Sequence, residues 1–335
     1  MPLQDPTSII VRGALQDVSI QYKNSMYVAD SVFPLIDNVY AKTQVAKYVK
    51  GSWFRDEAEP RGPGAAAVVG DFNVTTQNLD PINYAYATTV TDEERQQANV
   101  PGNLPIQPDI DAQEFIADKL DMKREVRCAA VLHAAAWSGQ SAGGVDAEGH
   151  WGDATAASDT FLADIVTARD TILAATGLLP NSLLLSWPAW SKLQMAPALL
   201  ALMNPQSLSS DALVQPNTLA ALIGIENLII AASVKNTAQA TQAGTEFTGV
   251  NIWGTSAAES KGIGFLYYRP TRPGLKQASA GYQYRVMNPL SGSGRLITQW
   301  REDARHSDMY DANEEVDISA VCLDAGFLFK DTATT

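Results

Sequence analysis

Hydrophobic and polar positions recur most regularly between Asp109 and Trp137, a stretch that contains neither Gly nor Pro. With ~100° between successive residues of a helix, one stripe collects these side chains: Phe115, Met122, Val126, Ala129, His133 and Trp137. Pro108 precedes the stretch, where its missing N–H costs nothing, and Asp109 or Asp111 can cap the first turn. Ser138–Gly139 is typical of a helix end. The pattern predicts one long helix over 109–137.

Charged residues sort along the two edges of this predicted stripe. The acidic edge contains Asp111, Glu114, Asp118, Asp121 and Glu125; the basic edge contains Lys119, Lys123 and Arg127, with Arg124 beyond them. Neighbours four residues apart are alike in sign, and each such pair costs about 0.2–0.5 kcal/mol. Only Asp121 and Arg124, which are opposite in charge and three residues apart, are spaced so that they attract each other. The counter-charges therefore come either from another segment or from another copy of the chain, unless the helix is simply a solvated one.

Residues 43–78 read as a long two-stranded hairpin. Thr43–Phe54 and Val68–Thr76 have the β-branched and aromatic character of strands, and Arg55–Gly64 gathers charges, prolines and glycines as a turn does. A lone hairpin is only marginally stable in water. We therefore expect it to lie on another surface, with Trp53 and Phe54 as anchors on a neighbouring molecule.

The remaining chain alternates strands and helices. The predicted strands are Leu79–Thr91, Leu183–Trp187, Leu228–Ala232, Ile263–Tyr268, a hairpin of Gly281–Asn288 with Arg295–Arg301, Glu315–Leu323 and Phe327–Phe329; the predicted helices are Thr160–Ala175, Trp190–Met203 and Thr218–Ile223. This alternation predicts a compact α/β lobe over Gly149–Gly262. The strands after residue 262, with Leu79–Thr91 and the long helix, are expected to form a second lobe.

Three stretches resemble the N-terminal part of tailed-bacteriophage major capsid proteins: YVADSVFP at Tyr27–Pro34, the run from Tyr48 that ends in WFRDEA at Ala58, and RGPG at Arg61–Gly64. The resemblance implies an α+β fold of the Hong Kong 97 type. Its parts would be an N-terminal arm (1–42), an extended hairpin loop (43–78), a peripheral domain (79–148) that includes a spine helix (109–137), an axial domain (149–262), and the second part of the peripheral domain (263–335).

The same resemblance implies a major capsid protein that assembles with itself into hexamers and pentamers of an icosahedral shell. The shell would enclose double-stranded phage DNA without sequence-specific binding, in a virion capsid assembled in the host cytoplasm, with a portal protein and scaffolding or decoration proteins as further candidate partners. An encapsulin-like nanocompartment, which shares the fold, and a soluble α/β enzyme remain alternatives. The expected subunit-interface residues are Trp53, Phe54, Arg55, Asp56, Glu57, Glu59, Arg61, Asp111, Glu114, Asp118, Lys119, Lys123 and Arg127.

Composition agrees with a shell that does not adhere to its contents. The 335 residues carry a net charge of −13, which argues against adhesive binding to phosphate backbones but not against enclosing them. No apolar run of about 18 residues and no signal peptide occur, so neither a membrane span nor secretion is expected. Cys128 and Cys322 are expected to be reduced thiols in apolar surroundings.

Candidate chemistry is sparse. His133 lies on the apolar stripe, and His150 and His306 have no Cys or His at metal-binding spacing. The acidic run Asp308–Glu315 lacks the spacing of a calcium-binding loop and is interpreted as a turn between strands. No phosphate loop or nucleophile elbow is present. We therefore expect no catalytic, cofactor-binding or metal-binding residue, and a protein that is not an enzyme.

Overall fold

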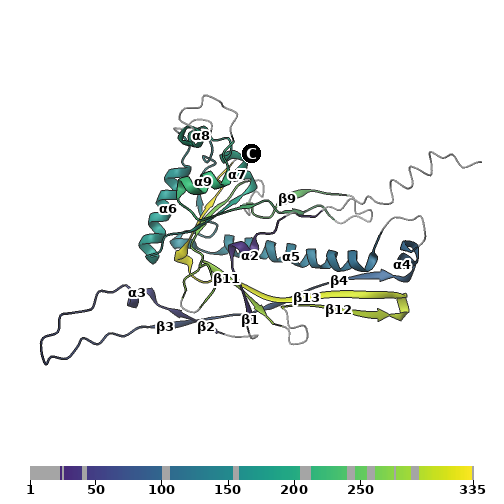
Figure 1. The fold of residues 1–335 in the computed structure, drawn as a ribbon, viewed down its shortest axis with the longest axis horizontal. Helices are drawn as coiled ribbons and strands as arrows, with labels where there is room; N and C mark the ends of the chain where they lie inside the picture. The colour runs from purple at the N-terminus through teal and green to yellow at the C-terminus, as the bar shows by residue number, and fades with distance from the viewer. Residues whose placement is uncertain are drawn as a thin grey trace, which may run out of the picture.

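The computed structural model shows an elongated layer of sheet and helix, a more compact lobe on it, and a hairpin that projects from one end (Figure 1). The structure describes residues 23–24, 26–39, 44–99, 106–153, 158–203, 213–239, 246–254, 261–274, 277–287 and 294–333. The predicted N-terminal arm at 1–42 lies largely outside these residues. The division into peripheral and axial domains stays a prediction.

The elongated layer is a five-stranded sheet built around one long strand, β13. Its strands are β1 (Leu35–Val39), β4 (Ile82–Thr91), β11 (Gly281–Val286), β12 (Arg295–Glu302) and β13 (Ser307–Ala320). β13 pairs antiparallel with β4, β11 and β12, and β1 is parallel to β11. The predicted hairpin between Gly281–Asn288 and Arg295–Arg301 is therefore wrong, because in the described chain each of these strands pairs with β13 instead.

The acidic run that the sequence assigns to a turn is instead part of β13. Tyr310, Ala312, Val316 and Ile318 are buried at every second or fourth position, which is the alternation of a half-buried strand. Asp311 and Glu315 lie on the other face, whereas Glu314 lies on the buried face. The high density of charge suggested a turn, but the two-residue period of the apolar positions decides the conformation.

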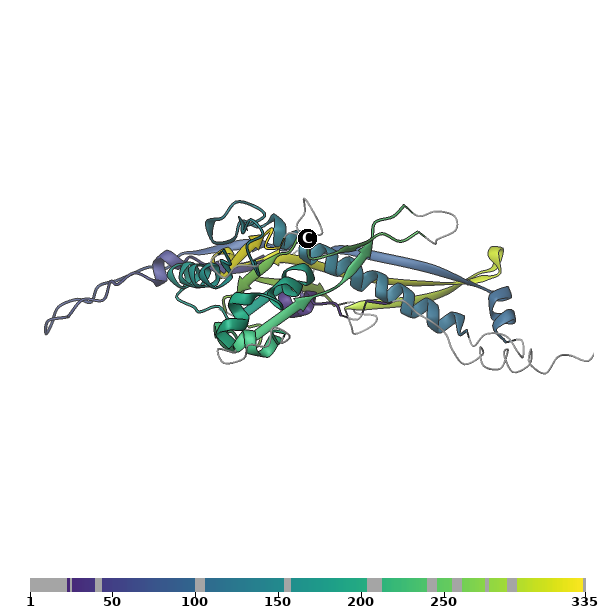
Figure 2. The same ribbon diagram turned by 90° about the horizontal axis from the view of Figure 1, so that it is seen from above.

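The long helix α5 covers one face of this sheet (Figures 1 and 2). It runs from Pro108 to Ala134, so the predicted helix is confirmed, but Trp137 lies beyond it in a short 3₁₀ turn. Pro108 occupies the first turn as expected. The helix begins after Gln107 without a side-chain cap, so capping by Asp109 or Asp111 is wrong.

The buried stripe of α5 differs from the predicted one. Ala112, Ile116 and Leu120 pack against β4 and β13, while Phe115 is 45% exposed. Further along, the buried residues are Glu125, Cys128, Ala129 and Leu132. The face that the helix buries is set by where the strands lie beneath it, and the sequence period alone selected a neighbouring row of side chains.

The compact lobe contains a second five-stranded sheet, in the order β5–β14–β10–β6–β7. The strands are β5 (Val145–Asp146), β6 (Ser182–Ser186), β7 (Asn227–Ala231), β10 (Gly264–Tyr267) and β14 (Gly326–Lys330). Thus the predicted strands Ile263–Tyr268 and Phe327–Phe329 do not join the first sheet as expected, because β10 pairs with β6 and β14. Their unbroken apolar character is typical of strands covered on both faces.

Helices cover the outer face of the second sheet. The predicted helix Thr160–Ala175 is confirmed as α6 (Phe161–Thr176), which ends at Gly177 with φ of 69°. The predicted helical region Trp190–Met203 forms two helices, α7 (Trp187–Leu193) and α8 (Pro197–Met203). The predicted helix Thr218–Ile223 is part of α9 (Pro216–Ile223). Leu183, Leu185 and Leu266 point into this helical layer.

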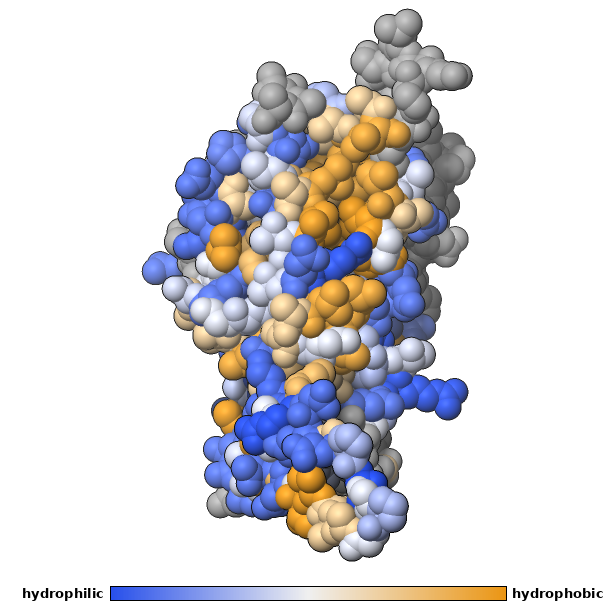
Figure 3. Space-filling view, turned by 90° about the vertical axis from the view of Figure 1, so that its left-hand side faces the viewer, coloured by the Kyte–Doolittle hydropathy of each residue, from blue (hydrophilic) through white to orange (hydrophobic). Residues whose placement is uncertain are grey.

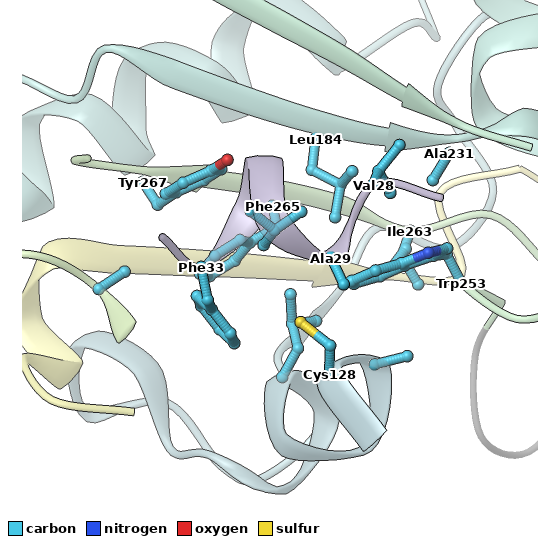
Figure 4. Packing of buried hydrophobic residues seen from close by; sticks show 14 of the residues in the cluster. Val28, Ala29, Phe33, Cys128, Leu184, Ala231, Trp253, Ile263, Phe265 and Tyr267 are labelled. Atoms are coloured by element: carbon cyan, nitrogen blue, oxygen red, sulfur yellow. The ribbon is translucent and has the colours of Figure 1, made fainter. Parts of the chain in front are cut away.

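The two sheets meet at a shared apolar core (Figure 4). Leu184, Phe265 and Leu328 point away from the outer helices into this core, because successive side chains of a strand face opposite sides. The short helix α2 (Ala29–Val32) and the end of α5 complete it. The rings of Trp137 and Phe265 lie 4.8 Å apart.

A carboxylate sits at the edge of this core. Glu125 of α5 is fully buried, and its oxygens accept hydrogen bonds from the backbone N–H groups of Val28 (3.0 Å) and Ala29 (2.8 Å), from Ser233 Oγ (3.1 Å) and from Trp253 Nε1 (2.5 Å). Burial raises the pKa of Glu125, and the donors from Val28 and Trp253 oppose that rise. Through Glu125, α5 is thus joined to the start of α2 and to the two segments that carry Ser233 and Trp253.

Replacing this carboxylate tests its role in stability. We expect Glu125→Ala to lower the free energy of unfolding by about 3 kcal/mol, because several buried donors lose their acceptor at once. Urea unfolding of the purified protein measures the change. Gln113→Ala, an exposed position on the same helix, is the control and should change stability by no more than about 0.5 kcal/mol. A similarly small effect at Glu125 would contradict the assignment.

Candidate assembly surfaces

The predicted hairpin is present and projects from the body (Figures 1 and 2). β2 (Gln44–Tyr48) and β3 (Val74–Asn78) pair antiparallel, and α3 (Lys50–Trp53) follows the first strand. Both strands are shorter than predicted, and the rest of the hairpin is irregular. Residues 53–76 are all exposed, so this part of the described chain is not covered by its own body.

The base of the hairpin is attached to the body. Val45 packs on the buried rings of Tyr282 and Tyr284. Lys50 Nζ lies 2.6 Å from Asp324 Oδ2 in η3 (Leu323–Ala325). Phe54 lies against Gly177, where an added Cβ would come 3.1 Å from its ring. The orientation of the hairpin is therefore set by its base while its outer part is free.

Aromatic side chains gather near the start of the free part. The rings of Tyr48, Trp53 and Phe72 lie 5.9–6.2 Å apart. Trp53 is 60% exposed and Phe54 is 67% exposed. The same side of the molecule carries a band of hydrophobic side chains (Figure 3), and on α6 the exposed ones are Val166 and Leu173. Exposed apolar groups of this size are typical of contact surfaces.

The hairpin tip is acidic overall. Between residues 54 and 73, the acidic residues Asp56, Glu57, Glu59 and Asp71 outnumber the two arginines, which gives a net charge of −2. Arg55 pairs with Glu57 within the tip at 3.1 Å, and Arg61 donates to the backbone oxygen of Ala65. Asp56 and Glu59 form no salt bridge with any described residue.

Some acidic side chains of α5 find partners within the same chain. Asp118 accepts a hydrogen bond from the hydroxyl of Tyr27 at 2.9 Å, and burial together with this carboxylate raises the pKa of Tyr27 to about 12. Asp121 pairs with Arg124 at 3.3 Å, as its spacing predicts. Asp111 and Glu114 are exposed and form no salt bridge in the described part of the chain.

Sequence reasoning missed an arginine cluster beside α5. Arg124, Arg285 and Arg295 approach the nearly buried carboxylate of Glu314 at 3.2, 3.4 and 3.3 Å. Asp121 also accepts from Arg295 at 2.6 Å. The only sequence signal was the spacing of Asp121 and Arg124, because Glu314 lies 190 residues beyond Arg124. Part of the acidic edge is thus neutralised within the chain.

The basic edge of α5 meets aromatic rings instead of carboxylates. Lys119 Nζ lies 5.0 Å from the centre of the Phe115 ring, and Lys123 Nζ and the guanidinium of Arg127 lie 5.7 and 4.1 Å from that of Tyr84. We call these three cations and two rings the basic strip. Among the described residues, none of its cations forms a salt bridge. Arg127 is half-buried and donates to the backbone oxygen of Val316 at 2.7 Å, so the charges of Lys119 and Lys123 are the ones open to an acidic partner.

A second ionic cluster fixes the N-terminal end of α5. α4 (Asp92–Ala98) supplies Arg95, which lies 2.6 Å from Asp109 and 2.7 Å from Asp308. Arg301 lies 2.6 Å from Asp92. Arg301 holds the pKa of Asp92 below its usual range, and Arg95 does so for Asp109 and Asp308.

Other candidate groups remain isolated. Burial lowers the pKa of His133, whose Nε2 is buried without a hydrogen-bond partner in the described structure. His150 is near Glu148 (3.6 Å) and Asp153 (3.8 Å). Within the described ranges, no group of three His, Cys, Asp or Glu side chains is arranged to hold a metal ion. No helix of the described chain is long and apolar enough to cross a membrane.

Comparison with known proteins gives structural neighbours only. No family model and no curated protein matches the sequence. A phage-related protein from Bordetella bronchiseptica RB50 is 20% identical with a TM-score of 0.66, over 99% of this chain and 98% of that chain. A capsid chain of cyanophage P-SCSP1u is 12% identical with a TM-score of 0.57, over 94% and 90%. A chain of the mature capsid of bacteriophage PhiM1 is 12% identical with a TM-score of 0.55, over 95% and 90%.

The lowered pKa values at the end of α5 predict how stability depends on pH. A carboxylate whose pKa is lower in the folded than in the unfolded state stabilises the fold above its ordinary pKa of about 3.9, and that contribution is lost as the pH falls further. We expect the melting temperature to fall as the pH drops from about 5 to about 3, and to fall less steeply in Arg95→Gln. Parallel pH profiles of the two proteins would contradict this.

The likeness extends over nearly the whole chain. The sequence resemblance and the structural comparison therefore agree, and this chain has the α+β fold of phage capsid proteins.

Proposed function

We propose that this chain is a major capsid protein that assembles with itself into hexamers and pentamers of an icosahedral shell around double-stranded phage DNA. The observation that carries the proposal is the projecting hairpin, whose residues 53–76 are exposed although they include Trp53, Phe54 and Phe72. In an isolated chain these aromatic groups remain exposed to water and contribute no stabilising free energy of burial. Contact with another copy would bury the aromatic side chains and remove their apolar surface from water.

Charge complementarity supports a specific docking site for the hairpin. Its acidic tip matches the basic strip on α5, whose cations have no carboxylate partner in the described chain. We propose that the tip of one copy lies over the basic strip of an adjacent copy. A single exposed ion pair contributes about 0–1 kcal/mol. Repetition around a closed shell makes the sum large, while each weak contact can still dissociate and correct errors during assembly.

The proposed location is a virion capsid assembled in the host cytoplasm, with a portal protein and scaffolding or decoration proteins as further partners. The net charge of −13 suits a wall that encloses DNA without adhering to it, since adhesion to phosphate backbones needs clustered Lys and Arg. Nuclease-protected DNA in particles purified from infected cells would support this content, and a protein cargo without DNA would contradict it.

Neutralising the hairpin tip tests its role in assembly. We expect the triple variant Asp56→Ala, Glu57→Ala and Glu59→Ala to melt within about 2 °C of the wild type, since all three side chains are exposed. Its yield of shells in negative-stain electron microscopy should fall strongly. A matched control removes three exposed acids from the body with Glu93→Ala, Asp170→Ala and Glu226→Ala. Normal shells from the tip variant would refute the role of the tip.

A charge exchange tests the pairing between the tip and the basic strip. Lys119→Glu with Lys123→Glu should impair assembly, because two acidic surfaces then face each other. Adding Glu57→Lys and Glu59→Lys to the same chain should restore it. Size-exclusion chromatography at low and high ionic strength measures both effects. If the combined variant assembles no better than the Lys variant alone, the two surfaces do not pair.

A further inference from the structure

A second hairpin leaves the body in the opposite direction from the first (Figures 1 and 2). It consists of β8 (Val234–Asn236) and β9 (Gly249–Asn251), which pair antiparallel as a separate two-stranded sheet. The sequence predicts only a polar, mobile segment here, over Val234–Gly249. Its described residues are mostly exposed, and a two-stranded sheet alone is marginally stable in water.

Side-chain hydrogen bonds hold this second hairpin in one shape. Asn236 Nδ2 donates to the backbone oxygen of Glu246 at 3.0 Å, and Asn236 Oδ1 accepts from the N–H of Thr248 at 2.8 Å. The N–H of Thr237 donates to the oxygen of Thr248 at 3.0 Å. These contacts extend the pairing beyond the short strands. The described part of the hairpin therefore has a defined shape in the single copy, which lowers the entropy cost of binding.

The hairpin presents one large apolar group. Phe247 is 73% exposed, and one edge of its ring lies beside Gly249. A Cβ added at Gly249 would lie 2.8 Å from the Phe247 ring and 3.2 Å from Val234, so the glycine makes the space that the ring occupies. A large exposed aromatic ring is the kind of group that anchors protein–protein contacts.

The root of the hairpin is fixed to the long helix. Ser233, directly before β8, and Trp253, two residues after β9, both donate to Glu125 of α5. Asn24 forms a second clamp, since its side chain accepts from the N–H of Val234 at 3.1 Å and donates to the oxygen of the same residue at 2.9 Å. The direction of the second hairpin is therefore set by contacts at its root, as that of the first hairpin is by contacts at its base.

We propose that the second hairpin is another assembly arm, with Phe247 inserting into an apolar surface of a second copy of this chain. This rests on the proposed function. The two hairpins extend in opposite directions, the second along α5 and short of the end formed by α4, so the two directions offer different surfaces (Figure 1). Contacts between unlike surfaces repeat head to tail and form a ring when the rotation between copies closes, whereas a two-fold dimer would need one surface to face itself. Two arms that point in opposite directions suit a ring of copies, because each arm faces a different neighbour.

Site-specific photocrosslinking tests the contact directly. Phe247 is replaced by p-benzoylphenylalanine, and assembled particles are irradiated, digested and analysed by mass spectrometry. We expect cross-links between copies of the chain, and none in the same protein kept dilute and unassembled. Cross-links only within one chain, or only to a different protein, would overturn the proposal.

Two substitutions at the same position give a second measurement. Phe247→Ser should raise the protein concentration needed for assembly by about tenfold or more, as loss of an interface anchor does, without lowering the melting temperature. Phe247→Tyr retains the ring and should assemble normally. If wild-type protein forms no shells, the proposed function fails; if it forms shells and Phe247→Ser matches it, only this inference fails.

Discussion

The burial of Glu125 on the long helix is the constraint on which the arrangement of the molecule depends. Ala112, Ile116 and Leu120 hold the first half of α5 on one sheet, and Cys128 and Leu132 hold its last turns in the core shared with the other. The carboxylate sits between these contacts and collects donors from three other segments. Because unpaired donors would be costly in so dry a place, those segments have few alternative positions.

Because the body is held together in this way, the apolar groups that remain exposed on the hairpins point to contacts with other copies. Much of the apolar surface of the described helices and sheets is buried in the shared cores, whereas Trp53, Phe54 and Phe247 are exposed on arms that are fixed at their bases. Stability of the body and association between bodies are thus supplied by different residues. Such a separation suits an assembling protein, because contacts at the arms can form and break without unfolding the chain.

The charges divide in the same way. Glu314, Asp121 and their arginines compensate one another inside one copy, close to the centre of the layer. Lys119 and Lys123 lie on the more open flank against aromatic rings, and Asp56 and Glu59 lie on the hairpin tip. The first group contributes to the fold. The second group has no opposite charge at hand in the described chain, and an adjacent copy offers it one.

Local sequence was sufficient for several of the main elements and for their order. The long helix, the projecting hairpin with its exposed aromatic residues, and α6 with its glycine end all follow from periodicity and turn residues, which act over a few positions. Strand partners do not follow in this way: β13 separates two strands that were expected to pair, and β10 joins the other sheet. The same holds for the site. The charge of the hairpin tip follows directly from the sequence. The burial of Glu125 and the arginines around Glu314 do not, because they depend on contacts between residues about 100 to 190 positions apart. Only the packed tertiary structure brings such residues together, because no local periodicity records which distant segment covers a given face.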